Sequence, residues 1–173
     1  MRLWHVRRVV FGFFVLQEAL IWATSTTEQR RAAPPLKRPA LFGGLLLLPL
    51  FWRLQRPAWL ERLALALQLT GWLLELAAMG QLIRNRSFGI HPTAATTGVQ
   101  SGLYRLEHPI YLGLLLSQIG WTLPCPPSWP VVLLMHRAFR AAITVERQHL
   151  ASLQILHRGP DSVLWGTRPP AAE

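Results

Sequence analysis

Cysteine, tyrosine and acidic side chains are scarce in this chain of 173 residues. It has a single cysteine, Cys125, so an internal disulfide and a cysteine-based metal site are both excluded. The pattern HExxH is also missing, and we expect no metal centre. There is no P-loop, no nucleotide-fold glycine motif and no Ser or Cys nucleophile beside a base. Any reaction would therefore depend on a cofactor that supplies most of the chemistry.

Charge of one sign is also scarce, because 18 Lys and Arg residues stand against 8 Asp and Glu residues. About half of the chain (51%) is hydrophobic and 15% is charged, and the apolar residues come in blocks. Such blocks are typical of an integral membrane protein, whose basic residues contact anionic lipid headgroups. No basic module with interleaved aromatics is present, so we expect membrane lipids as partners, no nucleic acid and no obligatory protein partner.

Five apolar segments can be drawn, over residues 9–24, 40–52, 59–83, 110–123 and 129–150. The second and fourth are shorter than the roughly 20 residues that a perpendicular spanning helix needs, so each borrows flanking residues or lies within the bundle. Only residues 53–58 separate the second from the third, and prolines interrupt 124–130. The sequence thus predicts an all-α integral membrane protein of about five transmembrane helices, arranged as a first helix plus two helical hairpins.

We interpret the chain as one membrane domain, 1–173. A three-helix part (1–83) is followed by a loop and the last hairpin (84–150) and by an extended tail (151–173). The polar interruption 84–109 carries several Gly and Pro residues and no helical apolar period, so we expect a long irregular loop before the fourth helix.

Basic residues predict the topology. The 25–39 and 84–109 loops and the C-terminal part together hold twice as many Lys and Arg residues as the segments expected on the opposite side. The positive-inside rule therefore makes the protein multi-pass, with the 84–109 loop and the C-terminus in the cytoplasm. The N-terminal arginines argue the other way. They also resemble the start of a signal peptide, but Gln17 and Glu18 within the apolar run favour a membrane helix.

Polar side chains gather where the long loop enters the fourth segment: Tyr104, Arg105, His108 and Tyr111. Pro109 suits the first turn of a helix, which puts His108 at or just before the N-cap. The backbone N–H groups there favour an anion. Gly113 allows another chain or a ligand to approach closely. An interfacial aromatic belt would explain the tyrosines, but not the histidine, the glycines and the loop length together.

The fifth segment begins apolar and ends charged. Ala142, Glu146 and His149 fall near one helical face. For Arg137, Arg147 and His149 we expect a helix emerging into water with solvated charges. Glu146 fits that interpretation and a functional one equally well.

Two acids, Glu18 and Glu75, lie inside apolar segments, where a carboxylate is costly. We expect structural hydrogen bonds between helices rather than catalysis, with partners among Gln17, Gln68, Gln81 and Gln118. Six tryptophans near segment ends predict interfacial anchoring: Trp4, Trp22, Trp52, Trp59, Trp121 and Trp129.

Eight loop residues match a pattern like S-G-x-Y-R-x-x-R-H-P-x-Y-x-G: Ser101, Gly102, Tyr104, Arg105, His108, Pro109, Tyr111 and Gly113. In this pattern the chain resembles the isoprenylcysteine carboxyl methyltransferase family and the related phospholipid methyltransferases. The resemblance covers roughly residues 82–150. It includes the order of elements, namely loop, helix, Pro-rich turn and a helix that carries a glutamate, here Glu146.

The resemblance implies S-adenosylmethionine as cofactor and methyl transfer to a lipophilic acceptor, either a prenylcysteine or isoprenoid carboxylate or a lipid headgroup. It implies cofactor contacts from Thr96, Thr97, Gly98, Val99, Tyr104, His108, Pro109, Tyr111 and Glu146. No catalytic residue is assigned, with His108 and Arg140 as candidates.

The chain departs from the family pattern at three points. The spacing between Tyr104 and His108 is one residue shorter, and Glu107 replaces an arginine. Ala142 stands where the family has an arginine four residues before the helix glutamate, and Arg140 is the nearest substitute. Two alternatives therefore stay open: an NADPH-dependent membrane reductase of the sterol-reductase type, and a non-catalytic decayed homologue.

Overall fold

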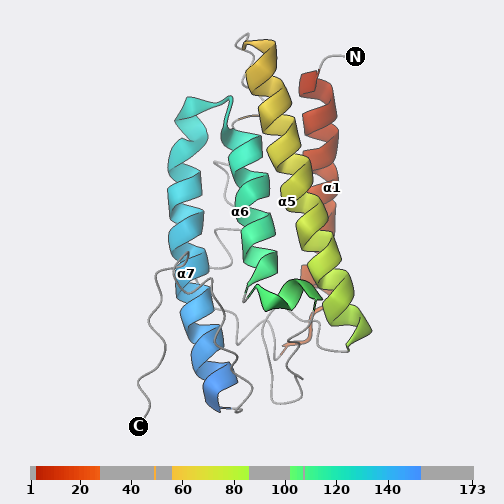
Figure 1. Cartoon of the computed structure of the whole chain (residues 1–173), viewed down its shortest axis with the longest axis vertical. Coiled ribbons are helices and arrows are strands. Elements are labelled where there is room, and N and C mark those ends of the chain that lie inside the picture. Colours follow the sequence, from red (N-terminus) through yellow and green to blue (C-terminus); the bar gives the residue numbers. More distant parts are fainter. Residues whose placement is uncertain (1–2, 28–48, 50–55, 86–101, 107, 153–173) are drawn as a thin grey trace.

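The computed structural model is a bundle of long helices, and it describes residues 3–27, 49, 56–85, 102–106 and 108–152. The helices are α1 (Leu3–Thr24), α5 (Ala58–Arg84), α6 (Pro109–Thr122) and α7 (Trp129–Ser152), with two short 3-10 turns, η2 (Gly102–Arg105) and η3 (Pro126–Ser128) (Figure 1). These ranges contain no strand, which confirms the all-α prediction.

Four of the five predicted apolar segments are helices, and α5, α6 and α7 begin and end within two residues of the predicted bounds. The first helix begins at Leu3, six residues before the predicted start at Val9, so it includes two arginines. The predicted segment 40–52 lies outside the described residues except for residue 49, and its hairpin with α5 and the tail beyond Ser152 lie outside them too. Most of the 84–109 loop also lies outside them, apart from η2, residue 106 and the start of α6.

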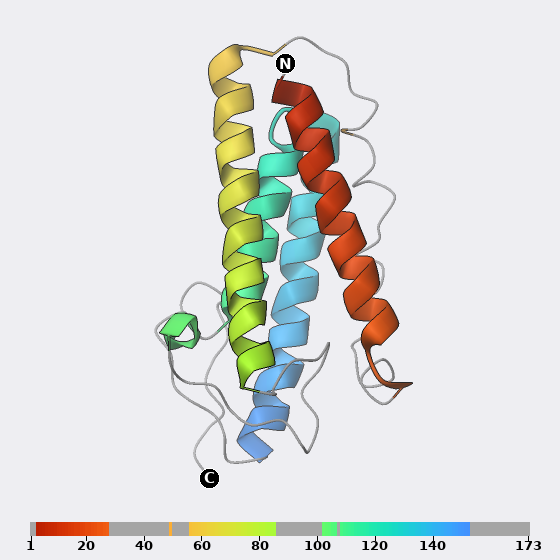
Figure 2. The ribbon, with the colours of Figure 1, turned by 90° about the vertical axis from the view of Figure 1, so that its right-hand side faces the viewer.

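Three helices run in one direction and one runs in the other. In Figures 1 and 2, α1, α5 and α7 descend and α6 ascends. The prolines after α6 end it, and two backbone hydrogen bonds close the turn, from Cys125 N–H to the Thr122 carbonyl (2.7 Å) and from Ser128 N–H to the Cys125 carbonyl (2.9 Å). The predicted hairpin of the fourth and fifth segments is therefore confirmed.

The two ends of the bundle differ. We call the lower end in Figure 1 the loop end, where α5 and α7 end, η2 lies and α6 begins; the opposite end is the turn end, with η3. The long loop and the end of the fifth segment were predicted to share one side. Their described parts, η2 and the end of α7, do so.

Helices α5 and α6 pack closely through glycines. A Cβ atom built on Gly71 would lie 2.5 Å from the Gly113 carbonyl oxygen, and one on Gly120 would lie 2.6 Å from the Ala64 carbonyl oxygen. Ala64, Gly71 and Ala78 repeat every seven residues along α5, and Gly113 and Gly120 do so along α6. A seven-residue repeat of small residues keeps one seam between two helices and lets their backbones touch. The close approach predicted at Gly113 is therefore made by α5.

Several polar side chains are buried and several large apolar ones face outward. Gln68, Glu75 and Gln118 are each 1% exposed, whereas Phe13, Leu73 and Leu133 are more than half exposed. Buried charged and amide groups are rare in water-soluble proteins. One described helix, Ala58–Arg84, is long and apolar enough to cross a membrane by length and composition.

Helix α6 has only 14 residues, or about 21 Å at 1.5 Å per residue. That is shorter than the roughly 30 Å hydrocarbon core of a bilayer. Nine of its residues are buried, and it contacts both α5 and α7. A short fourth segment was expected either to borrow flanking residues or to lie within the bundle, and α6 fits the second alternative.

An arginine from α1 holds the end of α6. Arg7 donates to the carbonyls of Gly120 (2.9 Å) and Trp121 (2.6 Å) and pairs with Glu61 of α5 at 3.0 Å. Carbonyls at the last turn of a helix lack intrahelical donors, and a cation there also complements the helix dipole. These partners explain how α1 extends through Arg7 while burying it.

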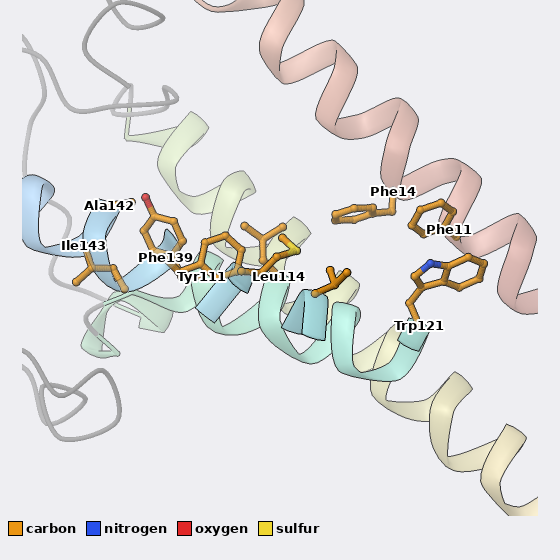
Figure 3. Close-up of a cluster of buried hydrophobic side chains, with 10 residues drawn as sticks. Phe11, Phe14, Tyr111, Leu114, Trp121, Phe139, Ala142 and Ile143 are labelled. Carbon is orange, nitrogen blue, oxygen red and sulfur yellow. The ribbon is translucent and has the colours of Figure 1, made fainter. Parts of the chain in front are cut away.

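One of the tryptophan predictions is wrong. Trp121 is 2% exposed, and its ring stacks on Phe11 of α1 at 4.1 Å between centroids, with an interplanar angle of 4°. It belongs to the buried cluster in Figure 3 and is not an interfacial anchor. Its place near the end of a segment was misleading because α1 passes the turn end there. Trp59 and Trp129 are exposed, as anchoring requires.

Candidate functional site

Four of the predicted site residues come from three elements that lie at the loop end. Tyr104 lies on η2, His108 and Tyr111 lie at the start of α6, and Glu146 lies on α7. The first two parts adjoin in sequence, whereas Glu146 is 35 residues from Tyr111.

The start of α6 follows the prediction from sequence. Pro109 occupies the first helical position and His108 the N-cap, with φ −137° and ψ 62°. No side chain caps this helix start. The first backbone N–H groups of a helix have no partner within it and carry the positive end of the dipole. His108 is buried, and its ring centroid lies 5.9 Å from that of Tyr111.

Tyr111 links α6 to α7. Its buried hydroxyl donates a hydrogen bond to a carboxylate oxygen of Glu146. Its ring also packs against Phe139 of α7, with the centroids 5.3 Å apart, as seen in Figure 3. The apolar part of the tyrosine thus belongs to the core, and its hydroxyl fixes a carboxylate at the core's edge. Glu146 itself remains partly exposed.

Tyr104 on η2 lies within electrostatic range of the same carboxylate. Burial raises the pKa of its hydroxyl above the ordinary value for tyrosine, and the nearby negative charge of Glu146 raises it further. The hydroxyl oxygen is buried and has no hydrogen-bond partner among the described residues. Tyr104 is therefore neutral at physiological pH, and within the described part of the chain its hydroxyl donor is unused.

Gln81, near the end of α5, contacts η2. Its side-chain oxygen accepts a hydrogen bond from Leu103 N–H at 3.1 Å, next to Tyr104. Sequence reasoning treated Gln81 only as a partner for intramembrane acids. No local signal could have shown this role, because the contact joins residues 22 positions apart.

The remaining predicted site residues separate into groups. Thr96, Thr97, Gly98 and Val99 lie outside the described residues, as does Glu107. Arg140 is exposed on α7. Ala142 is completely buried in the apolar cluster. That position has no room to spare for the arginine that the family pattern carries there.

The expectation of solvated charges at the end of α7 is wrong for Arg147 and right for Arg137. Arg137 is exposed, whereas Arg147 is 5% exposed. Arg147 follows Met135, Phe139 and Ile143 at four-residue intervals, and all three are buried. The inward stripe of α7 thus continues one turn further than the apolar residues indicate. The side chain of His149 lies outside the described set.

A second polar cluster joins α1 to α5. The Gln17 side-chain amide donates to Glu75 at 2.7 Å, and the Trp72 indole N–H donates to the Gln17 oxygen at 2.8 Å. The carboxyl group of Glu18 also interacts with that of Glu75. The prediction that the intramembrane acids bond between helices is therefore confirmed for Glu75, and Gln17 is its partner.

Comparison of the chain with protein-family models, with curated proteins and with solved structures finds no match. The geometry of the loop end and the residues themselves therefore carry the functional argument.

Proposed function

We propose that the loop end binds S-adenosylmethionine and that the protein transfers its methyl group to a lipophilic acceptor at the membrane interface. The observation that carries this proposal is the hydrogen bond from Tyr111 to Glu146. It joins the His-Pro-x-Tyr sequence to the helix glutamate of the resembled family, two features that are far apart in the chain. Chance matches in two segments would not be expected to meet in space.

The chemistry of these side chains fits the cofactor. Aromatic faces such as those of Tyr104 and Tyr111 stabilise a cation such as a sulfonium. The uncapped start of α6 at His108 and Pro109 suits a carboxylate. Glu146 suits ribose hydroxyls or an ammonium group through charge-assisted hydrogen bonds. The Tyr104 hydroxyl, which has no partner within the described ranges, adds a neutral donor near it.

Bound S-adenosylmethionine supplies an electrophilic methyl group, whose bond to sulfur breaks as the acceptor's electron pair forms the new bond. The residues of the chain hold the two reactants in line and keep water away, which is most of what such a displacement needs. A carboxylate acceptor is already nucleophilic at neutral pH. An amine acceptor would first lose a proton, for which His108 and Glu146 are the nearby groups.

A lipophilic acceptor is favoured by the surroundings of the site. Large apolar side chains are exposed on α1, α5 and α7, so an amphiphile can reach the bundle without leaving the bilayer. We place the loop end in the cytoplasm, following the distribution of basic residues. Arg7, one of the N-terminal arginines that argue against this orientation, is paired with Glu61 inside the bundle. It therefore counts little toward topology.

Radiolabelled methyl transfer tests the proposal. The purified protein in lipid nanodiscs receives labelled S-adenosylmethionine with a membrane lipid extract or a prenylated cysteine. We expect label in the organic phase from the wild type, and at least about a hundredfold less from Glu146→Gln, which keeps the shape but loses the charge. Thr144→Ala, an exposed change on the same helix, should behave as wild type.

Two results would overturn the proposal. One is the absence of both labelled product and S-adenosylhomocysteine binding in folded wild-type protein. The other is saturable binding of NADPH in place of S-adenosylhomocysteine, which would favour the reductase alternative.

A further inference from the structure

The turn that carries Tyr104 rests on one side chain of α5. Gln81 lies near the end of α5, and its oxygen accepts a hydrogen bond from Leu103 N–H. The residue before Leu103 is Gly102, whose φ of +61° falls in the left-handed region that favours glycine. A Cβ atom on Gly102 would lie 2.8 Å from the Gln81 side-chain oxygen and 2.9 Å from its nitrogen. The glycine thus provides both the backbone conformation and the space that this contact needs.

This contact lies next to Tyr104 in the chain. The turn η2 has four residues, and none of them is fully buried, although the Tyr104 hydroxyl is. A hydrogen bond from the N–H of Leu106, the residue after the turn, to the Leu103 carbonyl at 3.0 Å closes it, and the Gln81 contact joins it to α5. Tyr104 follows the anchored Leu103 directly. The negative charge of Glu146 on α7 contributes to raising the pKa of the Tyr104 hydroxyl, so this hydroxyl lies within electrostatic range of the carboxylate.

We propose that Gln81 is a positioning residue for the Glu146 site: it fixes η2 so that Tyr104 stays near the Glu146 carboxylate, and cofactor affinity depends on this contact. Gln81 acts through Leu103 and Tyr104 and touches no reacting group. The inference rests on the proposed cofactor site, but the contact itself can be tested without any cofactor.

The first experiment measures S-adenosylhomocysteine affinity by calorimetry in a double-mutant cycle. Gln81→Leu removes the acceptor at nearly constant volume, and we expect affinity to fall about tenfold, the range of one lost hydrogen bond. Gln81→Glu keeps an acceptor oxygen and should restore most of the affinity. In a Tyr104→Ala background, Gln81→Leu should have no further effect. Gln148→Leu, the same change at an exposed position of α7, is the matched control.

Equal losses from Gln81→Leu with and without Tyr104 would overturn the inference, because Gln81 would then act independently of the tyrosine. So would wild-type affinity in Gln81→Leu.

The second experiment needs no ligand. Hydrogen exchange of the peptide containing the Leu103 amide is compared in the wild type, Gln81→Leu and Gln148→Leu. We expect the Leu103 amide to exchange at least about tenfold faster in Gln81→Leu only. If the wild type fails to bind S-adenosylhomocysteine while Leu103 protection depends on Gln81, the contact stands and the proposed function fails. If protection is unchanged in Gln81→Leu, the positioning role is wrong whether or not the cofactor binds.

Discussion

Tyr104 and Tyr111 are the only tyrosines of the chain, and both lie beside Glu146 at the loop end. Their environments differ. Tyr111 uses its hydroxyl to hold the carboxylate, whereas the hydroxyl of Tyr104 has no partner among the described residues. A neutral phenol near a carboxylate can donate to a ligand that the carboxylate also binds. The polar side chains of the candidate site therefore lie together at one end of the bundle.

Because the chain has only two tyrosines, the titration of Tyr104 can be measured separately. In a Tyr111→Phe variant, tyrosinate absorbance near 295 nm reports Tyr104 alone. We expect its titration midpoint in the folded protein to lie above the ordinary tyrosine pKa of about 10, because burial and the Glu146 charge both disfavour the phenolate. In denaturant the midpoint should return to about 10. A folded-state midpoint at the ordinary value would show that Tyr104 is solvated and away from Glu146.

The same shift predicts a pH effect on stability. Above about pH 10 the unfolded chain releases the Tyr104 proton while the folded chain retains it, so the free energy of unfolding falls as pH rises. Tyr104→Phe should reduce this alkaline loss and leave stability near pH 7 little changed. Unfolding midpoints between pH 7 and 11 for the wild type and Tyr104→Phe would check it. Parallel pH profiles for the two proteins would contradict the prediction.

Some residue placements could be derived from sequence and others could not. The N-cap position of His108 follows from Pro109, because proline is restricted to the first turn of a helix. The burial of Arg147 and Trp121 could not be derived. The burial of a side chain depends on which helix packs against it, and the sequence of one segment does not show its packing partner.

At the scale of elements, the close contact between α5 and α6 requires glycine at particular positions. Adding a methyl group at Gly71 forces the two backbones apart, because its Cβ would lie 2.3 Å from Ser117 N. Gly80 on the same helix has nothing within 4 Å of an added Cβ. The two glycines therefore form a matched pair for testing the seam.

We expect Gly71→Ala to destabilise the protein by about 1–3 kcal/mol, as overpacking does. Gly80→Ala should be neutral or stabilise it by up to about 1 kcal/mol, because alanine is the better helix former. Thermal unfolding in detergent of both variants measures the contrast. Equal effects at both positions would show that α5 and α6 do not meet at Gly71.

The helix bounds were predictable because long apolar runs and prolines mark them clearly. The seven-residue repeat of small residues along α5 was also present in the sequence, but only Gly113 was interpreted in terms of close approach. The anchoring of η2 by Gln81 was not predictable, since a four-residue turn after a long loop has no periodic signal.

At the scale of the whole molecule, the bundle buries several polar groups beside its apolar cluster and exposes large apolar side chains. The described helices support the all-α class and one helix long enough to cross a membrane, while a five-helix, multi-pass arrangement stays a prediction. The orientation in the membrane is also a prediction, because it is derived from the distribution of Lys and Arg residues between the two ends.

Site-directed labelling tests the orientation. The native Cys125 is buried, so the wild type should not react with a membrane-impermeant maleimide and serves as the background. Leu106→Cys reports the loop end and Pro127→Cys the turn end. In sealed vesicles with the cytoplasmic face outward, we expect Leu106→Cys to be labelled and Pro127→Cys to be labelled only after permeabilisation. The reverse pattern would place the loop end on the opposite side.

The measurement that tests the central claim most directly is S-adenosylhomocysteine binding to the detergent-purified protein by calorimetry, beside Tyr104→Ala and Glu146→Ala. We expect micromolar binding by the wild type, clearly weaker but measurable binding by Tyr104→Ala and no measurable binding by Glu146→Ala, while both variants unfold cooperatively. A folded wild-type protein that does not bind S-adenosylhomocysteine, or variants that bind it as tightly as the wild type, would contradict the assignment of the cofactor site to the loop end.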